Sequence, residues 1–361
     1  MPKIIKIDFE AEHFNRTEIA AKRVQQIYLA TIKEAAQIAT SITNVDLSKP
    51  FSFADYPSTN ARVKKLIATH YGMVSNVITN ATLEEWSEAC IKSAELVKAI
   101  AGKTKLLPEQ IAKYGNRNLE ALSAFQKQKY NGLGLSDRVW NLSAQFKTDL
   151  EMGLDLGLGS GMSATDLSRE LRGFLNNPDE LFRRVRDKNG NLKLSKPAKA
   201  FHPGAGRYRS SYKNAMRLTR NTINEAYRES DHLQRQQLDF IVGFEVVRSN
   251  HVFACPICDA LKGKYPKTFH FVSWHVQCRC HVLEILTTQE EFISKQKRLL
   301  SGLADIPSKS ANEVTHLPDG FNKYMKDNKE KIRRSSDRDT LPNFIKHNRN
   351  LGIIKSILTV K

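Results

Sequence analysis

The chain has 361 residues and a net charge of +18, and hydrophobic residues make up 40% of it. This composition excludes a wholly disordered chain and allows roughly two or three packed domains. No apolar run is long enough for a transmembrane helix, and the first residues lack the apolar core of a signal peptide, so we expect a protein that is cytoplasmic when it is made. The excess of positive charge indicates an anionic partner, with DNA, RNA or a membrane surface as the options.

Apolar residues at three- and four-residue spacing predict a helical region over the first 155 residues. Its predicted helices cover 14–48, a stretch from about Asn60, a stretch from Thr82 to Gly102, and 136–155. The capping box Thr82-x-x-Glu85 predicts that the third helix starts separately from the second. We find no catalytic constellation of side chains in this region.

A basic segment follows a short helix that is predicted to begin at Ser163-x-x-Asp166 and to end near Phe174. Its lysines and arginines are interleaved with Gly, Asn and Pro, which is typical of a solvent-exposed loop or arm. Two interpretations are open: a merely solvated loop, or non-specific contact with nucleic-acid phosphates. The second interpretation assigns phosphate binding to five arginines: Arg183, Arg184, Arg186, Arg207 and Arg209.

A long helix with one buried apolar side is predicted over residues 211–238. On this helix, Arg220 and Glu225 are expected to pair with each other or with neighbouring side chains. The β-branched and aromatic residues of 240–247 then predict a strand that leads into a cysteine-rich region. The remaining predicted β elements are a hairpin over 264–274 and a last strand over 282–286.

Four of the chain's five cysteines lie in one window, which reads Cys255-Pro-Ile-Cys258, sixteen further residues, and His275-Val-Gln-Cys278-Arg-Cys280. Two ligand pairs, each separated by two residues, are typical of a tetrahedral zinc site, because one tight turn can aim both side chains of a pair at the same ion. The spacing favours Cys255, Cys258, His275 and Cys278. Cys280 is the substitute, because residues 278 and 280 point the same way on a strand. His270 and His281 are nearby spares.

Other uses of these cysteines agree less well with the sequence. Disulfides are typical of exported proteins, and nothing in the sequence suggests export. A thioredoxin-like redox pair needs a βαβ setting and gives no use for His275 and Cys278. Four thiolate or imidazole ligands leave no open position on zinc, and Glu284, the nearest downstream carboxylate, belongs to no catalytic zinc motif. We therefore expect a structural zinc ion that holds a small module together.

The order of these parts resembles the phage Mu F-like minor head protein family, also called the phage head morphogenesis proteins. The resemblance covers roughly residues 150–287. In the long helix it rests on Arg220, Asn224, Ala226 and Tyr227. In the cysteine-rich region it rests on Cys255, Cys258, Leu261, Gly263, His275, Cys278, Arg279 and Cys280. The chain departs from the family pattern at Arg220-Asn221-Thr222, where the family has Arg-Thr-Glu, and at Val276, where the family has proline.

The resemblance implies a minor component of a tailed-phage or prophage capsid that acts in head assembly, and we expect it to be a structural protein without enzymatic activity. Such a protein is assembled in the host cytoplasm and then lies in the capsid interior near the portal. The implied partners are the portal and capsid proteins and the packaged DNA, with no membrane. The net charge of +18 fits this setting, because packaged DNA is a dense array of phosphates.

The sequence thus predicts a mainly α fold with a C-terminal α+β module that contains a zinc-knuckle β-hairpin. The expected domains are a helical region over 1–155 that docks onto the portal or capsid, a head-morphogenesis module with the zinc site over 156–287, and a basic C-terminal part over 288–361. This last part is expected to form one or two helices and an extended tail.

Two rival functions belong to other classes. A zinc-stapled nuclease would need a catalytic histidine and a second hard-metal ligand on a helix beyond the knuckles, but the segment after Cys280 offers only His281 and Glu284. Magnesium-dependent DNA cleavage would identify it. A free-standing DNA-binding protein would bind DNA with a salt dependence steeper than a dispersed charge gives.

Overall fold

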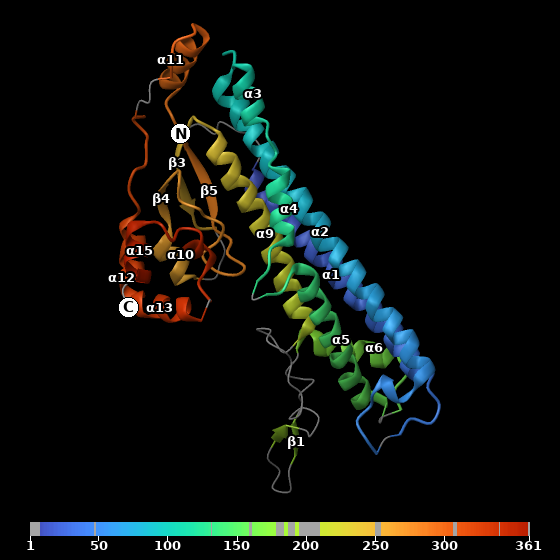
Figure 1. The fold of residues 1–361 in the computed structure, drawn as a ribbon. Helices are drawn as coiled ribbons and strands as arrows, with labels where there is room; N and C mark the ends of the chain where they lie inside the picture. Colours follow the sequence, from blue (N-terminus) through green and yellow to red (C-terminus); the bar gives the residue numbers. More distant parts are fainter. Residues whose placement is uncertain are drawn as a thin grey trace. The chain divides into compact units, whose positions relative to one another are not determined.

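The computed structural model describes residues 8–46, 48–130, 132–158, 161–177, 184–186, 192–194, 210–249, 254–305, 309–338 and 340–359. These residues confirm the predicted fold class, because they are mainly helical and carry a small three-stranded antiparallel sheet near the C-terminus (Figure 1). They divide into two compact units. We call them the helical unit (Thr17–Ala81 and Gln126–Arg220) and the sheet unit (Met1–Arg16, Thr82–Phe125 and Asn221–Lys361).

The helical unit buries one apolar core between its helices, with Val24, Ile32, Phe146 and Leu167 fully inside. Its last short helix begins as predicted, because the Ser163 hydroxyl accepts a hydrogen bond from the N–H of Asp166. The elements that belong to it in whole or in part are α1 (Phe9–Thr40), the 3-10 helix η1 (Phe53–Asp55), α2 (Pro57–Ala101), the end of α4 (Leu119–Lys127), α5 (Leu135–Leu158), α6 (Ala164–Asn176), β1 (Arg184–Arg186), β2 (Leu192–Leu194) and α9 (Ser211–Gln237).

The predicted separate helix start at Thr82 is wrong, because α2 continues through this position without a break. Thr82 and Glu85 are both buried, and the Glu85 carboxylate lies 2.6 Å from the His13 ring instead of capping a helix end. A capping box is a local pattern, and here a tertiary contact uses the same side chain. The helix ends as predicted before Gly102, whose φ of 55° is the left-handed conformation that glycine adopts easily.

The sheet unit is built around β3, which pairs with both other strands of its antiparallel sheet in the order β4-β3-β5. The predicted hairpin over 264–274 is therefore wrong: residues 263–266 form β4, and the segment after it contains no strand. The elements of this unit outside α1, α2 and α9 are α3 (Pro108–Tyr114), α4 (Leu119–Lys127), β3 (Ile241–Val247), α10 (Pro256–Leu261), β4 (Gly263–Pro266), β5 (His281–Leu286), α11 (Gln289–Leu300), α12 (Asp319–Asp327), α13 (Lys329–Asp337), α14 (Asn343–Lys346) and α15 (Gly352–Thr359).

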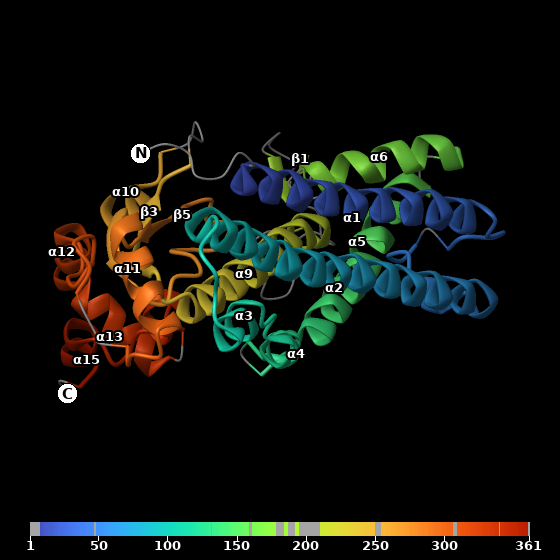
Figure 2. The same cartoon turned by 90° about the horizontal axis from the view of Figure 1, so that it is seen from above.

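The described C-terminal residues form the five helices α11 to α15, whereas one or two helices and an extended tail were expected. α12 contacts both α10 and α15, and α13 also contacts α15, so these helices gather beside the sheet (Figures 1 and 2). Phe321, Met325, Phe344 and Ile354 are fully buried in the same apolar cluster as three of the cysteines. The basic side chains that dominate the sequence here lie between these apolar positions at helical spacing, which places them on the outer faces. Among the described residues, no helix is both long and apolar enough to span a membrane.

Candidate metal centre

The first pair of thiols is positioned by the short helix α10. Cys255 precedes the helix and Pro256 begins it, where the missing N–H of proline costs no helical hydrogen bond. The N–H of Asp259 donates to the carbonyl of Cys255 at 2.9 Å, and the N–H of Lys262 donates to that of Cys258 at 3.0 Å. These bonds fix one helical turn, so both sulfurs can approach the same partner.

The second pair lies on a tight turn that is anchored to α9. The N–H of Cys278 donates to the carbonyl of His275 at 3.0 Å, which closes the turn. Gln277, inside it, has a φ of 61°, a left-handed conformation that is unfavourable for a residue with a Cβ. Its N–H donates to the Asn221 side chain at 3.2 Å, and this contact helps to hold the strained residue in place.

The predicted ligands converge in two groups of three that share one thiol. The groups are Cys255, Cys258 and His275, and Cys258, Cys278 and Cys280, and the ligand atoms within each group lie within 4.8 Å of one another. The fold thus brings together all five side chains that the spacing singled out. Cys278 and Cys280 both lie within reach of Cys258, so both are candidates for the fourth position.

Three distances between ligand atoms are close to those around a tetrahedral ion, although no four of the five ligand atoms lie within 4.8 Å of one another. The sulfurs of Cys258 and Cys278 are 3.8 Å apart, and the Nε2 atom of His275 is 3.1 Å from the Cys255 sulfur and 3.2 Å from the Cys258 sulfur. Zinc bound at its usual lengths separates two sulfurs by about 3.8 Å and a sulfur and a nitrogen by about 3.6 Å. The sulfur pair matches, and the ring would need to retreat by roughly half an ångström.

The His275 ring is already oriented for metal binding. Its Nδ1 atom lies 2.9 Å from the carbonyl oxygen of Val276, and a carbonyl can only accept, so Nδ1 carries the proton. The lone pair of the neutral ring is therefore on Nε2, the atom that faces the two sulfurs. A backbone carbonyl that fixes the tautomer in this way is the usual second partner of a metal-bound histidine.

The surroundings favour the thiolate, the metal-binding form of cysteine, at Cys255 and Cys278, whereas the neighbouring Cys278 and burial raise the pKa of Cys258 and Cys280. Hydrogen bonds from the thiols of Cys258 and Cys280 lower the pKa of Cys278 well below its usual value. Burial opposes ionisation of Cys255, but the N–H and thiol of Cys258 and the nearby His275 lower its pKa overall. All five cysteines are free. A cation bound there would stabilise these two thiolates inside the apolar core, and the donor set of sulfur and imidazole suits a soft or borderline metal.

The five arginines that were predicted to bind nucleic acid do not form a described site. Arg183, Arg207 and Arg209 lie outside the residues that the structure describes. Arg184 and Arg186 belong to β1, which pairs with β2 in a two-stranded antiparallel sheet. Their phosphate contacts stay a prediction.

A buried network of charged side chains in the sheet unit was not predicted. Arg235 donates to the Glu284 carboxylate at 2.9 and 3.1 Å and to Asp231 at 3.1 Å. Lys92 lies 2.7 Å from the same aspartate and 3.9 Å from Glu284. All four side chains are almost fully buried. Glu284, the carboxylate that the nuclease alternative would need, therefore has two cationic partners.

A second part of the network joins α1 to α9. Arg228 donates to the Glu10 carboxylate through two nitrogens, one of them at 2.9 Å. Burial alone would raise the pKa of Glu10, but the charges of Arg228 and Lys92 hold it well below its usual value. The sequence did carry a signal: Arg228, Asp231 and Arg235 recur at three- and four-residue spacing, so they share one face of the helix. A charged face of this kind is usually solvated, so the pattern alone does not reveal that it is buried.

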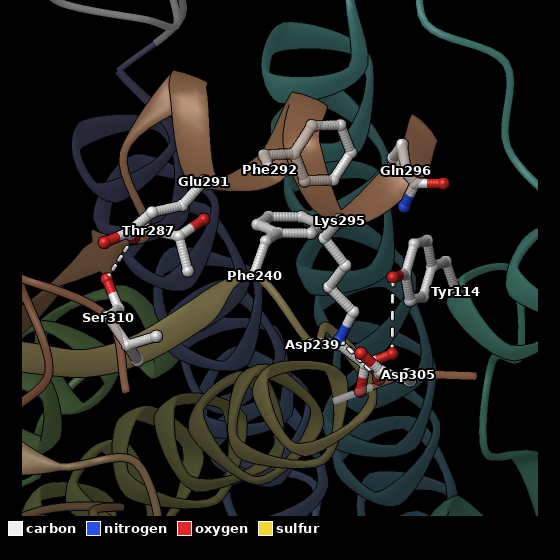
Figure 3. Close-up of a pocket in the computed structure, with 11 residues that line it drawn as sticks. Tyr114, Asp239, Phe240, Thr287, Glu291, Phe292, Lys295, Gln296, Asp305 and Ser310 are labelled. Carbon is white, nitrogen blue, oxygen red and sulfur yellow. Dashed lines mark hydrogen bonds and ion pairs between the residues drawn. The ribbon is translucent and has the colours of Figure 1, made fainter. Parts of the chain in front are cut away.

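A pocket of about 130 Å³ opens elsewhere in the sheet unit, between α3, α11 and the start of β3 (Figure 3). Its walls combine the aromatic rings of Phe240 and Phe292 with an ion pair, in which Lys295 lies 2.8 Å from Asp305. The residues that line it include neither cysteine nor histidine. This pocket is therefore separate in composition from the metal centre.

No protein-family model matches the chain, and searches of curated proteins and of solved structures find no match either.

Proposed function

We propose that this chain is a minor head protein of a tailed phage or prophage, which acts without enzymatic activity in head assembly at the portal. The observation that carries the proposal is the joining of its two motifs. Asn221 directly follows Arg220 of the helix motif, at a position where the chain departs from the family pattern, and it accepts a hydrogen bond from the N–H of Gln277 in the turn between His275 and Cys278. Tyr227 of the same helix is fully buried and stacks on His13, with the ring centroids 4.1 Å apart. The helix motif and the cysteine-rich motif therefore belong to one folded module.

The proposed cofactor is one structural zinc ion, held by Cys255, Cys258, His275 and Cys278, with Cys280 as the substitute ligand. When bound, zinc would supply no reaction but would cross-link α10 to the turn that follows β4. Four protein ligands would complete its tetrahedral shell and exclude a reactive water. The short strands of this sheet bury little surface alone, so such a cross-link would contribute much of the module's stability.

The zinc proposal predicts that removing ligands unfolds the module. We expect the double variant Cys255→Ser/Cys258→Ser to lose its zinc and to melt at a clearly lower temperature, as measured by elemental analysis and circular dichroism. Cys90→Ser is the matched control, because Cys90 is also a free thiol but contacts Ser230 and Gln234 instead of the cluster. Comparing Cys278→Ser with Cys280→Ser identifies the fourth ligand. Unchanged zinc content and melting in the double variant would contradict the proposal.

The proposed partners are the portal and capsid proteins and packaged DNA, and the proposed location is the capsid interior near the portal after assembly in the host cytoplasm. Co-expression with the portal and major capsid proteins of the same genome tests this directly. We expect a few copies to sediment with the procapsids, and fewer when the portal is omitted. A zinc-loaded, folded chain that stays entirely in the unassembled fraction would overturn the proposed role.

The proposed DNA contact is non-specific and rests on the +18 charge and on the basic segment with Arg183, Arg184, Arg186, Arg207 and Arg209. Replacing these five arginines by glutamine should weaken binding equally for unrelated DNA sequences. It should also make binding less salt-dependent, with the slope reduced by about 0.9 for each phosphate that is no longer neutralised. Incubation of the same DNA with magnesium tests the nuclease alternative, for which cleavage is required. Sequence-selective binding would instead favour the free-standing DNA-binding alternative.

A further inference from the structure

A second group of metal-ligand side chains lies in the sheet unit, apart from the cysteine cluster. Glu229 comes from α9, His270 from the segment after β4, and His347 from the residue directly after α14. Their ligand atoms all lie within 4.8 Å of one another, although the three residues are distant in sequence. Nothing in the sequence pattern groups them, because no two of them share a motif.

The hydrogen bonds of His270 determine which of its nitrogens is available. Its Nε2 atom lies 2.7 Å from the Glu229 carboxylate, and an ionised carboxylate can only accept, so Nε2 carries the proton. The lone pair of the neutral ring is then on Nδ1. This atom is 3.1 Å from the Nδ1 atom of His347. The two nitrogens therefore share either one proton or one cation.

The separation of the two nitrogens is close to that of a bound metal. Two imidazoles on a tetrahedral zinc ion, at bond lengths of about 2.0–2.1 Å, hold their nitrogens about 3.3 Å apart. Accepting an ion would thus move the rings of His270 and His347 by only a few tenths of an ångström. Glu229 would fix the tautomer of His270, as carboxylates do for many metal-bound histidines.

The cluster is also held in place by its neighbours. Asn348, which is buried, accepts a hydrogen bond from the N–H of His270 and donates one to its carbonyl, both at 2.8 Å. The ring of His232 stacks flat on that of His270, with centroids 3.9 Å apart and an angle of 7° between the planes. These contacts restrict the His270 ring before any ligand arrives, which lowers the entropy cost of binding.

We propose that Glu229, His270 and His347 form a second divalent-metal site, for a late first-row ion such as Zn²⁺, Co²⁺ or Ni²⁺. These ions accept two imidazoles as donors, here His270 and His347, and Glu229 orients the first of them. His347 is exposed, so the ion exchanges with solvent, unlike an ion enclosed by the buried thiols. The site links the segment after α14 to α9 and so clips the C-terminal helices onto the core. This inference does not depend on the proposed role in head assembly.

Cobalt titration of the purified, tag-free chain tests the site. Thiolate-bound Co²⁺ has intense near-ultraviolet charge-transfer bands, whereas Co²⁺ bound to imidazole nitrogens has only weak visible bands. We expect a second equivalent of Co²⁺ to bind without adding charge-transfer intensity, and to be removed by a mild chelator before the first. Glu229→Gln should lower the affinity for this second Co²⁺ ion about 10- to 100-fold, as the loss of an orienting carboxylate does at other metal sites.

Variants separate the second site from the cysteine cluster. His347→Ala should abolish the second equivalent and leave the first, and because His347 is exposed the fold should survive, which circular dichroism checks. His316→Ala is the matched control, since His316 is exposed and lies in another segment. Cys255→Ser/Cys258→Ser should remove the charge-transfer bands. If the original chain bound only one Co²⁺ ion and His347→Ala bound one as well, the proposal would be overturned. The two histidines would then share only a proton.

Discussion

Asp149 of α5 is a buried carboxylate whose protonation should make the stability of the helical unit depend on pH. Its Oδ2 atom accepts a hydrogen bond from the N–H of Ser211, the first residue of α9, at 3.0 Å. Its Oδ1 atom has no hydrogen-bond partner. Burial raises the pKa of Asp149 to about 7, even though the hydrogen bonds from Ser211 act to lower it.

The sign of the effect follows from comparing the folded and unfolded states. Below a pH of about 4, Asp149 is protonated in both the folded and the unfolded state, so its ionisation does not lower the free energy of unfolding. Between about 4 and 7 the unfolded chain releases the proton and the folded chain keeps it, so stability falls as the pH rises. Above the folded pKa of about 7 the loss levels off. A difference of about three in pKa corresponds to about 4 kcal/mol at this plateau.

We therefore predict that Asp149→Asn gains stability relative to the original chain as the pH increases. Asn cannot ionise, so the difference in unfolding free energy should change by about 2.5 kcal/mol in its favour between pH 5 and pH 8. The unpartnered amide adds an offset of about 1–3 kcal/mol against the variant at every pH, and this offset cancels in the comparison. Urea unfolding followed by circular dichroism at both pH values measures the change.

The control is Glu170→Gln, an exposed carboxylate on α6 of the same unit. The unfolding free energy of Glu170→Gln should differ from that of the original chain by the same amount at pH 5 and pH 8. Surface substitutions usually change this free energy by no more than about 0.5 kcal/mol. If Asp149→Asn also showed no change with pH, the carboxyl group would not be protonated in the folded protein. The reasoning from burial would then be refuted.

Two further substitutions test contacts in the sheet unit. Gly320→Ala should destabilise the chain by about 1–3 kcal/mol, because the added Cβ would lie 2.4 Å from the backbone oxygen of Ala260 in α10. The control is Gly352→Ala, which has open space around the added Cβ and should be neutral or stabilising by up to about 1 kcal/mol. Equal melting temperatures for the two variants would contradict the close approach of α12 to α10. Arg235→Met should cost about 3–5 kcal/mol in denaturant unfolding, because it leaves Glu284 and Asp231 with one cation, and adding Glu284→Gln should recover part of that loss. A double variant as unstable as the single one would exclude this ionic explanation.

The sequence located the cluster of cysteines and His275 because its information is local. Cys255 and Cys258 are one helical turn apart, and His275 and Cys278 are the ends of one tight turn, so spacing alone specifies how each pair is aimed. The long helix α9 was predicted almost to the residue for a similar reason, since its apolar positions repeat at the helical period. Periodicity and turn geometry can be recognised without knowing which residues pack against the helix or turn.

Tertiary structure decided whatever depends on contacts between distant segments. Only the fold could show that Glu85 faces His13, that Glu284 pairs with Arg235, and that the basic C-terminal residues belong to packed helices. A charged side chain looks the same in a sequence whether water or an opposite charge surrounds it. The cluster of Glu229, His270 and His347 has the same origin: its members come from three segments that only packing brings together.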